Sequence, residues 1–337
     1  MYTGKSIFIT FLSGITAIII SNILLMCYYN LPVHKDSPFG TTDYVWEKNA
    51  PWIKMTEGIS WGRLDANGFN NPSVIENPDV LILGSSHMEA INVFQSRNTA
   101  ALLGEYFAES GYHLSVYNRG ISGHHFLKCL KYLKKNTEST SAKYVVIETS
   151  KIDFTAKEIA KLLENKIDVT KSVSSGIIFY LQKMPVFRLL YMQLEHGLLT
   201  LFLPKSGKTP LPKNCEIAET QREIEDSQEK LFSFIEKNAS GKKIIIFYHP
   251  ATKPDKNGNL VYETNETYFS EFAKAAKNHG IAFVDLTAAT ENLWRFQHKT
   301  THGFCTGTAF GGHLNANGHK IVAEQLYKTI LKMEQPK

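Results

Sequence analysis

Residues 79–87 read Asp-Val-Leu-Ile-Leu-Gly-Ser-Ser-His, and this stretch constrains the fold more than any other part of the chain. Its apolar run, residues 80–83, is typical of a strand buried on both faces of a parallel sheet. Ser85, Ser86 and His87 follow Gly84, where such a strand would turn into a helix. Ligands of open α/β sheets bind at the carboxyl ends of the strands. A serine there is placed for nucleophilic attack if a histidine takes its proton, although serine is also a common helix N-cap.

Apolar runs and amphipathic stretches alternate along the rest of the chain. We expect further strands at residues 113–117, 144–147, 243–248 and 282–284. We expect helices at residues 99–110, 126–135, 217–238, 266–278 and 317–332. Strand–helix alternation of this kind predicts an α/β fold with a doubly wound parallel sheet and right-handed crossovers.

The N-terminal segment predicts a membrane anchor. Residues 7–28 are apolar without one charged residue, and at about 1.5 Å per residue they can cross a hydrocarbon core of roughly 30 Å. Lys5 before the run favours a cytoplasmic N-terminus, although Lys35 follows on the other side. A cleaved signal peptide is the alternative, but no small-x-small cleavage site follows Leu25. We expect an uncleaved single-pass anchor in the cell membrane, with the domain extracytoplasmic.

The chain divides into an anchor at residues 1–30, a stalk and lead-in at 31–78, and a domain at 79–335. The lead-in is rich in Pro, Asn, Gly and Trp, which predicts irregular structure packed on the domain. Residues 155–214 interrupt the alternation and form an expected insertion. Its apolar middle, residues 177–203, carries Lys183, Pro185, Arg188 and Glu195, which argue against a second membrane span. Two core helices, a cover over the site and a surface resting on the bilayer remain open.

Composition excludes several classes of function. The net charge is only +5, and Lys residues lie beside Glu, so no nucleic-acid partner is expected. The four cysteines show no pair spacing and no metal-type cluster, so neither a disulfide framework nor a metal site is expected. No Walker loop or Gly-x-Gly-x-x-Gly motif is present, and no cofactor is expected.

Four polar clusters lie at expected strand ends or before the final helix: residues 84–86, 118–123, 148–150 and 313–319. A serine nucleophile needs a base within hydrogen-bond reach and donors aimed at the oxyanion. Glycine allows a backbone N–H to approach that oxygen closely, and the N–H of Ser86, at a helix start, is expected to point the same way.

On these residues the chain resembles the SGNH (GDSL-type) hydrolases over about residues 78–332. Gly84-Ser85-Ser86 matches their first block with Ser86 as nucleophile, and Asn118-Arg-Gly-Ile-Ser-Gly123 matches the second, with Gly123 in the oxyanion hole. His313-Leu-Asn-Ala-Asn-Gly matches the last, with His313 as base. The resemblance implies a flavodoxin-like three-layer sandwich. Two positions depart from the pattern: Ser150 stands for the oxyanion asparagine, and Phe310 for the aspartate three residues before the histidine.

Several roles remain open on the sequence. Asp285, Glu148 or a backbone carbonyl are the alternatives for orienting His313. Contacts to substrate are expected from His87, Asn118, His249, His302 and Asn315.

Gly-Ser-Ser together with an anchor also resembles the D-alanine transfer protein of teichoic-acid modification and anchored proteins of exopolysaccharide acetylation. This resemblance implies an extracytoplasmic serine esterase or O-acyltransferase, with acetyl expected, that acts on cell-envelope or exported polysaccharide through a Ser86–His313 acyl-enzyme. A membrane-bound acyltransferase is an expected partner. Two alternatives stand: an inactive relative that binds glycan or scaffolds an acylation complex, and a soluble lipase released from a cleaved signal.

Overall fold

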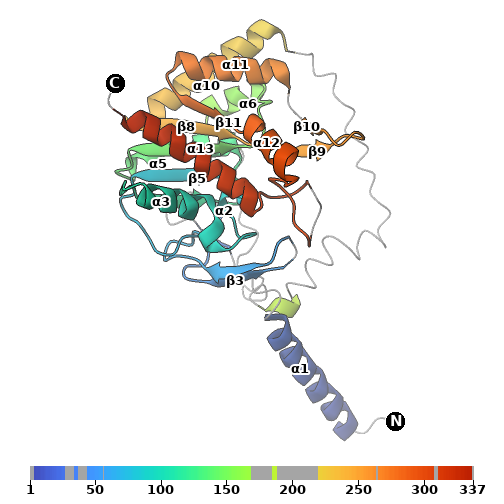
Figure 1. Cartoon of the computed structure of the whole chain (residues 1–337). Coiled ribbons are helices and arrows are strands. Elements are labelled where there is room, and N and C mark those ends of the chain that lie inside the picture. The colour runs from blue at the N-terminus through green and yellow to red at the C-terminus, as the bar shows by residue number, and fades with distance from the viewer. Residues whose placement is uncertain are drawn as a thin grey trace.

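The computed structural model describes residues 4–26, 34–36, 44–55, 57–167, 184–187, 219–262, 265–306 and 310–335. Its centre is a five-stranded parallel sheet made of β5 (Val80–Gly84), β6 (Val116–Gly120), β7 (Tyr144–Thr149), β8 (Lys243–Tyr248) and β11 (Ala282–Asp285). The strands lie in the order β11-β8-β7-β5-β6 (Figure 1). Counted along the chain this is the order 2-1-3-4-5 of flavodoxin-like sheets, in which ligands bind where the order reverses.

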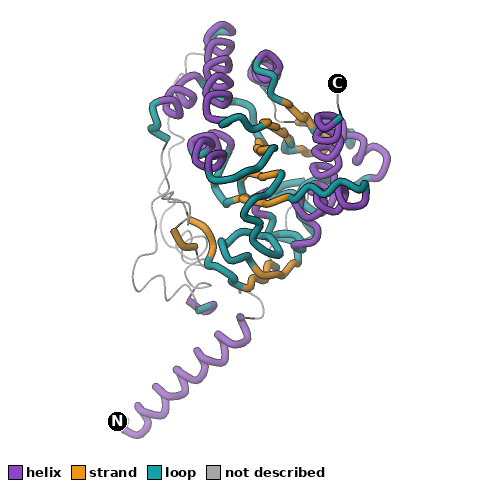
Figure 2. Tube along the Cα trace, turned by 90° about the vertical axis from the view of Figure 1, so that its left-hand side faces the viewer, coloured by secondary structure: helices purple, strands orange, loops and turns teal. Residues whose placement is uncertain are grey.

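Helices cover both faces of the sheet, because alternate strand residues point to opposite sides. Leu81, Val145 and Ile246 face a core formed with α4 (Phe126–Lys131), α5 (Leu133–Glu138), α6 (Ala156–Leu163), α10 (Gln221–Asn238) and α11 (Glu266–Asn278). Val80, Val146 and Ile245 face a second core formed with α3 (Thr99–Glu109), α12 (Thr287–Gln297) and α13 (Ala316–Glu334). The helices therefore flank the strands in three layers (Figure 2), and the expected α/β sandwich is confirmed.

The elements depart from the sequence prediction in three places. The second strand begins at Val116 rather than at residue 113 and continues to Gly120, because Asn118 and Arg119 pair with β5. The helix expected at residues 126–135 is divided at Tyr132 into α4 and α5. Helix α12 was not predicted, since its N-cap is Leu286, which forms no side-chain cap. The remaining strands and α3, α10, α11 and α13 agree with the expectation within a few residues.

The lead-in is more regular than expected and forms two hairpins. β1 (His34–Asp36) pairs with β2 (Tyr44–Trp46), and β3 (Pro51–Lys54) pairs with β4 (Ser60–Arg63), all antiparallel. Trp52 is fully buried, and Asn70 and Asn71 donate to backbone carbonyls of the domain, so residues 44–55 and 57–78 pack as part of it. A short helix α2 (Ser86–Glu89), a 3-10 turn (Gln95–Arg97) and a β9–β10 hairpin (Thr252–Pro254, Leu260–Tyr262) complete the strands and helices described for the domain.

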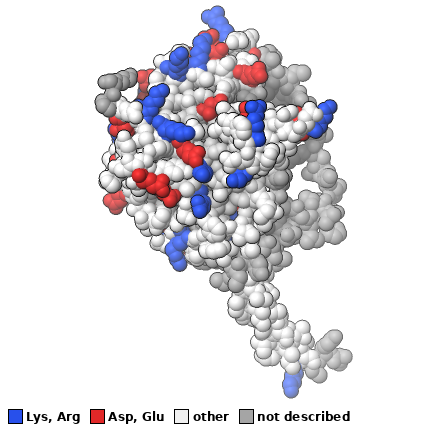
Figure 3. All heavy atoms as spheres, in the orientation of Figure 1, with Lys and Arg blue, Asp and Glu red and all other residues white. Residues whose placement is uncertain are grey.

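Helix α1 (Gly4–Met26) projects away from the domain (Figure 1). Among the described residues it is the one helix long and apolar enough to cross a membrane. Most of its apolar side chains are exposed, with Phe8 at 65% and Phe11 at 68%, which a helix surrounded by lipid would tolerate. In Figure 3 it carries no charge except near its N-terminal tip, whereas the domain shows Lys, Arg, Asp and Glu side by side. The helix suits a signal anchor or a signal peptide.

The expected insertion at residues 155–214 is described only in part. Helix α6 begins with a capping box of Thr155 and Glu158 and buries Ile159 and Leu162 in the core, which places residues 155–163 within the domain. The apolar middle at residues 177–203 lies outside the described residues except for residues 184–187.

Candidate active site

Ser86 lies at the carboxyl end of β5, at the start of the short helix α2 (Ser86–Glu89). The cap of that helix is Ser85, whose hydroxyl accepts from the His87 N–H at 3.3 Å. The N-cap reading of the sequence thus holds for Ser85, and it leaves the Ser86 hydroxyl available for other partners. Ser86 is half-buried, whereas Ser85 is 4% exposed.

The His313 side chain lies within hydrogen-bond distance of Ser86. Its Nε2 lies 2.8 Å from Ser86 Oγ. Its loop is held by an antiparallel bridge between His302 and Leu314 and by the Gly303 N–H, which donates to the His313 carbonyl at 3.2 Å. The two residues matched from separate motifs therefore stand at the distance that proton transfer requires.

Glu57 completes a three-residue chain. Its Oε2 lies 2.7 Å from His313 Nδ1, and its Oε1 accepts from the His313 backbone N–H at 2.6 Å. An ionised carboxylate only accepts hydrogen bonds, so Nδ1 carries the proton and Nε2 presents its lone pair to the Ser86 hydroxyl. Burial alone would raise the pKa of Glu57, but the hydrogen bonds from His313 lower it below its ordinary value. The arrangement is that of a serine nucleophile, a base and an orienting acid.

None of the three alternatives that the sequence left open for orienting His313 takes that role. Asp285 is exposed and accepts from the Thr287 N–H at 2.9 Å, at the start of α12. Glu148 bonds to His249 instead, at 2.9 Å. The acid comes from the lead-in, 256 residues before His313, at the turn between β3 and β4. No spacing in the sequence connects two positions so far apart.

The turn that holds Glu57 fits closely against the site. The Asn92 amide donates to the Glu57 carbonyl at 2.9 Å, and Gly58 N–H donates to Thr306 Oγ1 at 2.9 Å. Gly312, at φ +76°, passes so near the carboxylate that an added Cβ would lie 1.9 Å from Glu57 Oε1. A glycine beside His313 is therefore required for Glu57 to reach it.

The loop that bears Gly123 follows β6 and lies next to the start of α2, because the Ile121 N–H donates to the Gly84 carbonyl at 2.9 Å. The Ser86 and Gly123 N–H groups donate to no other residue of the described ranges. The loop that bears Gly123 is held against α2, because Glu89 accepts from the Ser122 N–H at 3.1 Å and from its hydroxyl at 2.6 Å. Ser150 is half-buried after β7 at the same sheet edge, and within the described chain it bonds to neither Ser86 nor His313.

A buried carboxylate and two histidines lie beneath the nucleophile. Glu148, 2% exposed, accepts from the Ser85 N–H at 2.5 Å and from His249 Nε2 at 2.9 Å. His249 Nδ1 lies 3.2 Å from His302 Nε2, and His302 Nδ1 lies 3.0 Å from Thr301 Oγ1. Burial alone would raise the pKa of Glu148, but the hydrogen bond from His249 keeps it well below its ordinary value. Burial, with the neighbouring His249, lowers the pKa of His302 to about 3.

Four of the five residues expected to touch substrate are engaged inside the protein. His249 and His302 are 2% and 3% exposed. The Asn118 amide donates to the Met88 carbonyl at 2.6 Å and its oxygen accepts from the Gly120 N–H, while Asn315 caps α13. These side chains bond to other groups of the protein rather than lie open to a substrate, a difference that the sequence did not indicate.

His87 is the fifth of these residues, and it is half-buried beside the Ser86–His313 pair. Its Nδ1 accepts from the Leu314 N–H at 3.1 Å, and its ring centroid lies 5.2 Å from that of His313. Burial, with the adjacent His249, lowers the pKa of His87 well below its ordinary value. The ring is therefore neutral at pH 7.

Comparison with known proteins finds only distant likenesses. No family model matches the chain, and no curated protein sequence matches it. Similar solved structures include the acetyl xylan esterase AlAXEase, at 16% identity and TM-score 0.40, covering 74% of this chain and 99% of that one. The lipase/acylhydrolase from Enterococcus faecalis has 17% identity and TM-score 0.40, covering 77% and 98%.

A third structure, from Desulfitobacterium hafniense DCB-2, is described as a candidate lipolytic protein of the G-D-S-L family. It has 11% identity and TM-score 0.36, covering 75% of this chain and 99% of that one. The chain is thus distantly similar to GDSL-type esterases and lipases, and its fold is established by its own sheet.

Proposed function

We propose that the protein is a membrane-anchored, extracytoplasmic serine esterase or O-acyltransferase. The observation that carries the proposal is the hydrogen-bonded chain from Glu57 through His313 to Ser86, with contacts of 2.7 and 2.8 Å. Each contact has the polarity that a nucleophilic serine needs, because the carboxylate fixes the histidine proton on Nδ1. Glu57 also supplies the acid that the family pattern places three residues before the histidine, where this chain has Phe310.

The reaction follows from these three groups. Ser86 Oγ attacks the ester carbonyl while its proton passes to His313 Nε2. The resulting oxyanion accepts from the N–H groups of Ser86 and Gly123, each worth about 10²–10³ in rate when well aimed. Collapse breaks the bond to the leaving alcohol, which takes the proton from His313 and leaves Ser86 acylated.

The second half-reaction regenerates the serine. His313 removes a proton from the acceptor hydroxyl, that oxygen attacks the acyl carbon, and Ser86 departs with the proton from His313. Water as acceptor makes the protein an esterase, and a sugar hydroxyl makes it a transferase. Both outcomes use the same acyl-enzyme.

The substrate that we propose is an acetylated cell-envelope or exported polysaccharide. Helix α1 supports a location at the membrane, where such glycans and a membrane-bound acyltransferase partner would lie. The motif resemblance to anchored envelope proteins supports the same class of substrate. The alternative of an inactive, glycan-binding relative depended in part on the lack of an acid to orient His313. Glu57 occupies that position, so this argument for inactivity is weaker.

The experiment uses the full chain, purified in detergent, with 4-nitrophenyl acetate and then acetylated polysaccharides. We expect ester cleavage, and acetyl bound to Ser86 in a rapidly quenched sample analysed by mass spectrometry. Ser86→Ala should abolish both signals, while His113→Ala, on an exposed loop, should leave them unchanged. Absence of cleavage and of acetyl-Ser86 in a folded sample would instead favour the inactive relative.

The proposed location has its own test. After alkaline extraction of cell membranes we expect the chain, with its N-terminal residues intact, in the membrane pellet. A protease added outside should digest the domain. A shortened chain in the soluble fraction would contradict the anchor and support the cleaved signal.

A further inference from the structure

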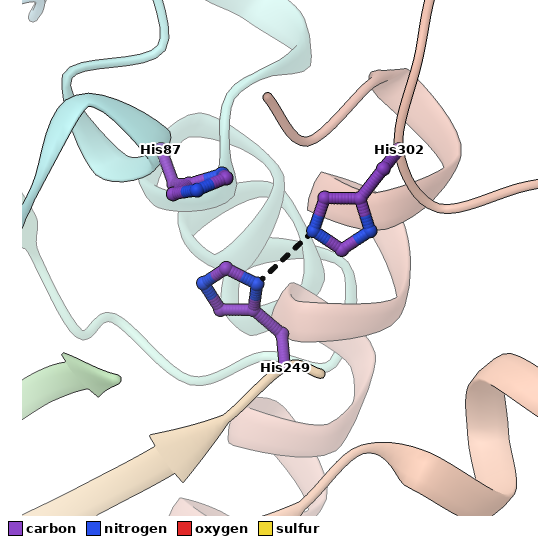
Figure 4. A group of neighbouring side chains, drawn as sticks. All are labelled: His87, His249 and His302. Atoms are coloured by element: carbon purple, nitrogen blue, oxygen red, sulfur yellow. Dashed lines mark hydrogen bonds between the residues drawn. The ribbon is translucent and has the colours of Figure 1, made fainter. Parts of the chain in front are cut away.

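Three histidines from separate elements converge beside the Ser86–His313 pair. His87 is in α2, His249 directly follows β8, and His302 lies in the loop that pairs with Leu314 before α13. One ligand nitrogen of each lies within 4.8 Å of the other two, and the rings surround a common space in Figure 4. We propose that His87, His249 and His302 bind a divalent transition-metal ion, with zinc as the expected metal.

The distance between two of the rings suits a metal. His249 Nδ1 and His302 Nε2 lie 3.2 Å apart. Two nitrogens bound to zinc at about 2.0–2.1 Å with a tetrahedral angle lie about 3.3 Å from each other. The separation of these two nitrogens therefore already matches that of two zinc ligands, and an ion would replace their hydrogen bond once each ring turns its lone pair toward it.

The groups behind the two rings allow each of the facing nitrogens to carry a lone pair. His249 Nε2 donates to Glu148 at 2.9 Å, which leaves the lone pair of His249 on Nδ1. Thr301 Oγ1, 3.0 Å from His302 Nδ1, can accept from that nitrogen and so leave the His302 lone pair on Nε2. A carboxylate behind a metal-binding histidine is a recurrent outer partner, and the buried Glu148 also offsets the charge of the cation.

His87 is the ligand that must adjust. Its Nδ1 lone pair is occupied by the Leu314 N–H at 3.1 Å. Binding through Nδ1 uses that lone pair, and binding through Nε2 requires the proton on Nδ1, so either mode opens this hydrogen bond. Its ring centroid is already within 4.6 Å of His249 and 5.6 Å of His302, so a ring rotation brings a nitrogen to the ion.

The donor set limits which ions fit. Three neutral imidazoles favour zinc, copper, nickel or cobalt over magnesium or calcium, which prefer oxygen. The proposed metal site is next to the proposed catalytic pair in sequence, because His87 follows Ser86 and Leu314, which donates to His87, follows His313. Occupation of the site should therefore stabilise the fold and alter the reactivity of Ser86.

The test is metal binding by the full chain, purified in detergent without a polyhistidine tag and stripped with a chelator. Calorimetric titration with zinc should give one ion per chain, and the unfolding temperature should rise with zinc by mass action. Glu148→Gln, which removes an outer partner, should weaken binding about 10-fold, and His249→Ala and His302→Ala, which each remove a ligand, should weaken it by more than that. His113→Ala, at an exposed position, and Cys305→Ser, at an exposed free cysteine, should bind as the parent does.

X-ray absorption of the zinc-loaded parent protein tests the ligands without any variant, which covers the case in which a histidine variant fails to fold. Three imidazole nitrogens support the proposal. A sulfur- or carboxylate-dominated spectrum, no saturable binding by the folded parent, or full binding by His249→Ala and His302→Ala would each overturn it. None of these readouts depends on ester cleavage, so the metal site and the esterase stand or fall separately.

Discussion

Replacing Glu57 by glutamine tests the orienting acid in the proposed mechanism. The carboxylate contacts His313 twice, at the backbone N–H (2.6 Å) and at Nδ1 (2.7 Å). In Glu57→Gln the amide oxygen can keep the backbone contact, but the NH₂ group then faces Nδ1. His313 must place its lone pair on Nδ1 and its proton on Nε2. That tautomer offers Ser86 a donor instead of a base.

The corresponding change in serine proteases lowers kcat by about 10⁴. The Glu57 and His313 side chains are 22% and 28% exposed, so water can rescue the correct tautomer in part. We therefore expect a loss of about 10³ in kcat/KM, or about 4 kcal/mol of transition-state stabilisation. The folded state should change little, because the glutamine fills the same volume and keeps one contact.

The assay is the second-order rate of Ser86 phosphonylation by a fluorophosphonate, together with kcat/KM for 4-nitrophenyl acetate. Asp285→Asn is the matched control: it neutralises an exposed carboxylate that holds only the start of α12, and it should react as the parent does. A folded Glu57→Gln protein within about tenfold of the parent would refute the orienting role, since a tautomer change cannot cost so little.

Two further predictions concern stability. Burial is the main reason that the pKa values of His302 and His319 are lowered to about 3 in the folded protein. Between about pH 6 and 4 each of these histidines is therefore protonated in the unfolded chain but not in the folded one. These two groups should together lower the free energy of unfolding by about 2.7 kcal/mol per pH unit of acidification, and His319→Gln should remove about half of that contribution. Urea unfolding that is flat between pH 6 and 4.5 would contradict this. In Gly120→Ala, the new Cβ would lie 2.2 Å from the Glu89 backbone nitrogen, so α2 must shift, the protein should be destabilised, and Ser86 should lose phosphonylation rate. Gly104→Ala is the control on α3, because its new Cβ would meet nothing within 4 Å, and it should raise the free energy of unfolding by up to about 1 kcal/mol. Equal effects of the two substitutions in urea unfolding would argue against the close contact between Gly120 and α2.

The sequence predicts the sheet well because its strands are buried on both faces and read as short apolar runs. β8 and α11 begin and end where expected, and β5 differs only by Gly84. The prediction is poorer where a boundary depends on tertiary contacts. Asn118 and Arg119 belong to β6 because β5 supplies a partner for their backbone, which no local propensity reveals.

The residues of the candidate site also fall into two groups, those that local motifs predict and those that only tertiary contacts bring together. Ser86 and His313 are found from local motifs, since each lies at the junction of a loop and a helix. Glu57 is not, because its partner is 256 residues away and its own turn carries no motif. The three converging histidines are likewise separated by long stretches of sequence. The expectation of no metal site rested on local spacing, which carries no information about a cluster assembled from three separate elements.

The central claim is that Ser86 is an activated nucleophile, and covalent labelling of the detergent-purified full chain with a fluorophosphonate tests it most directly. Peptide mapping by mass spectrometry should place one adduct on Ser86. The adduct should be lost in His313→Ala and retained in His113→Ala. A folded protein that gives no adduct on Ser86, or that labels there at the same rate without His313, would contradict the mechanism.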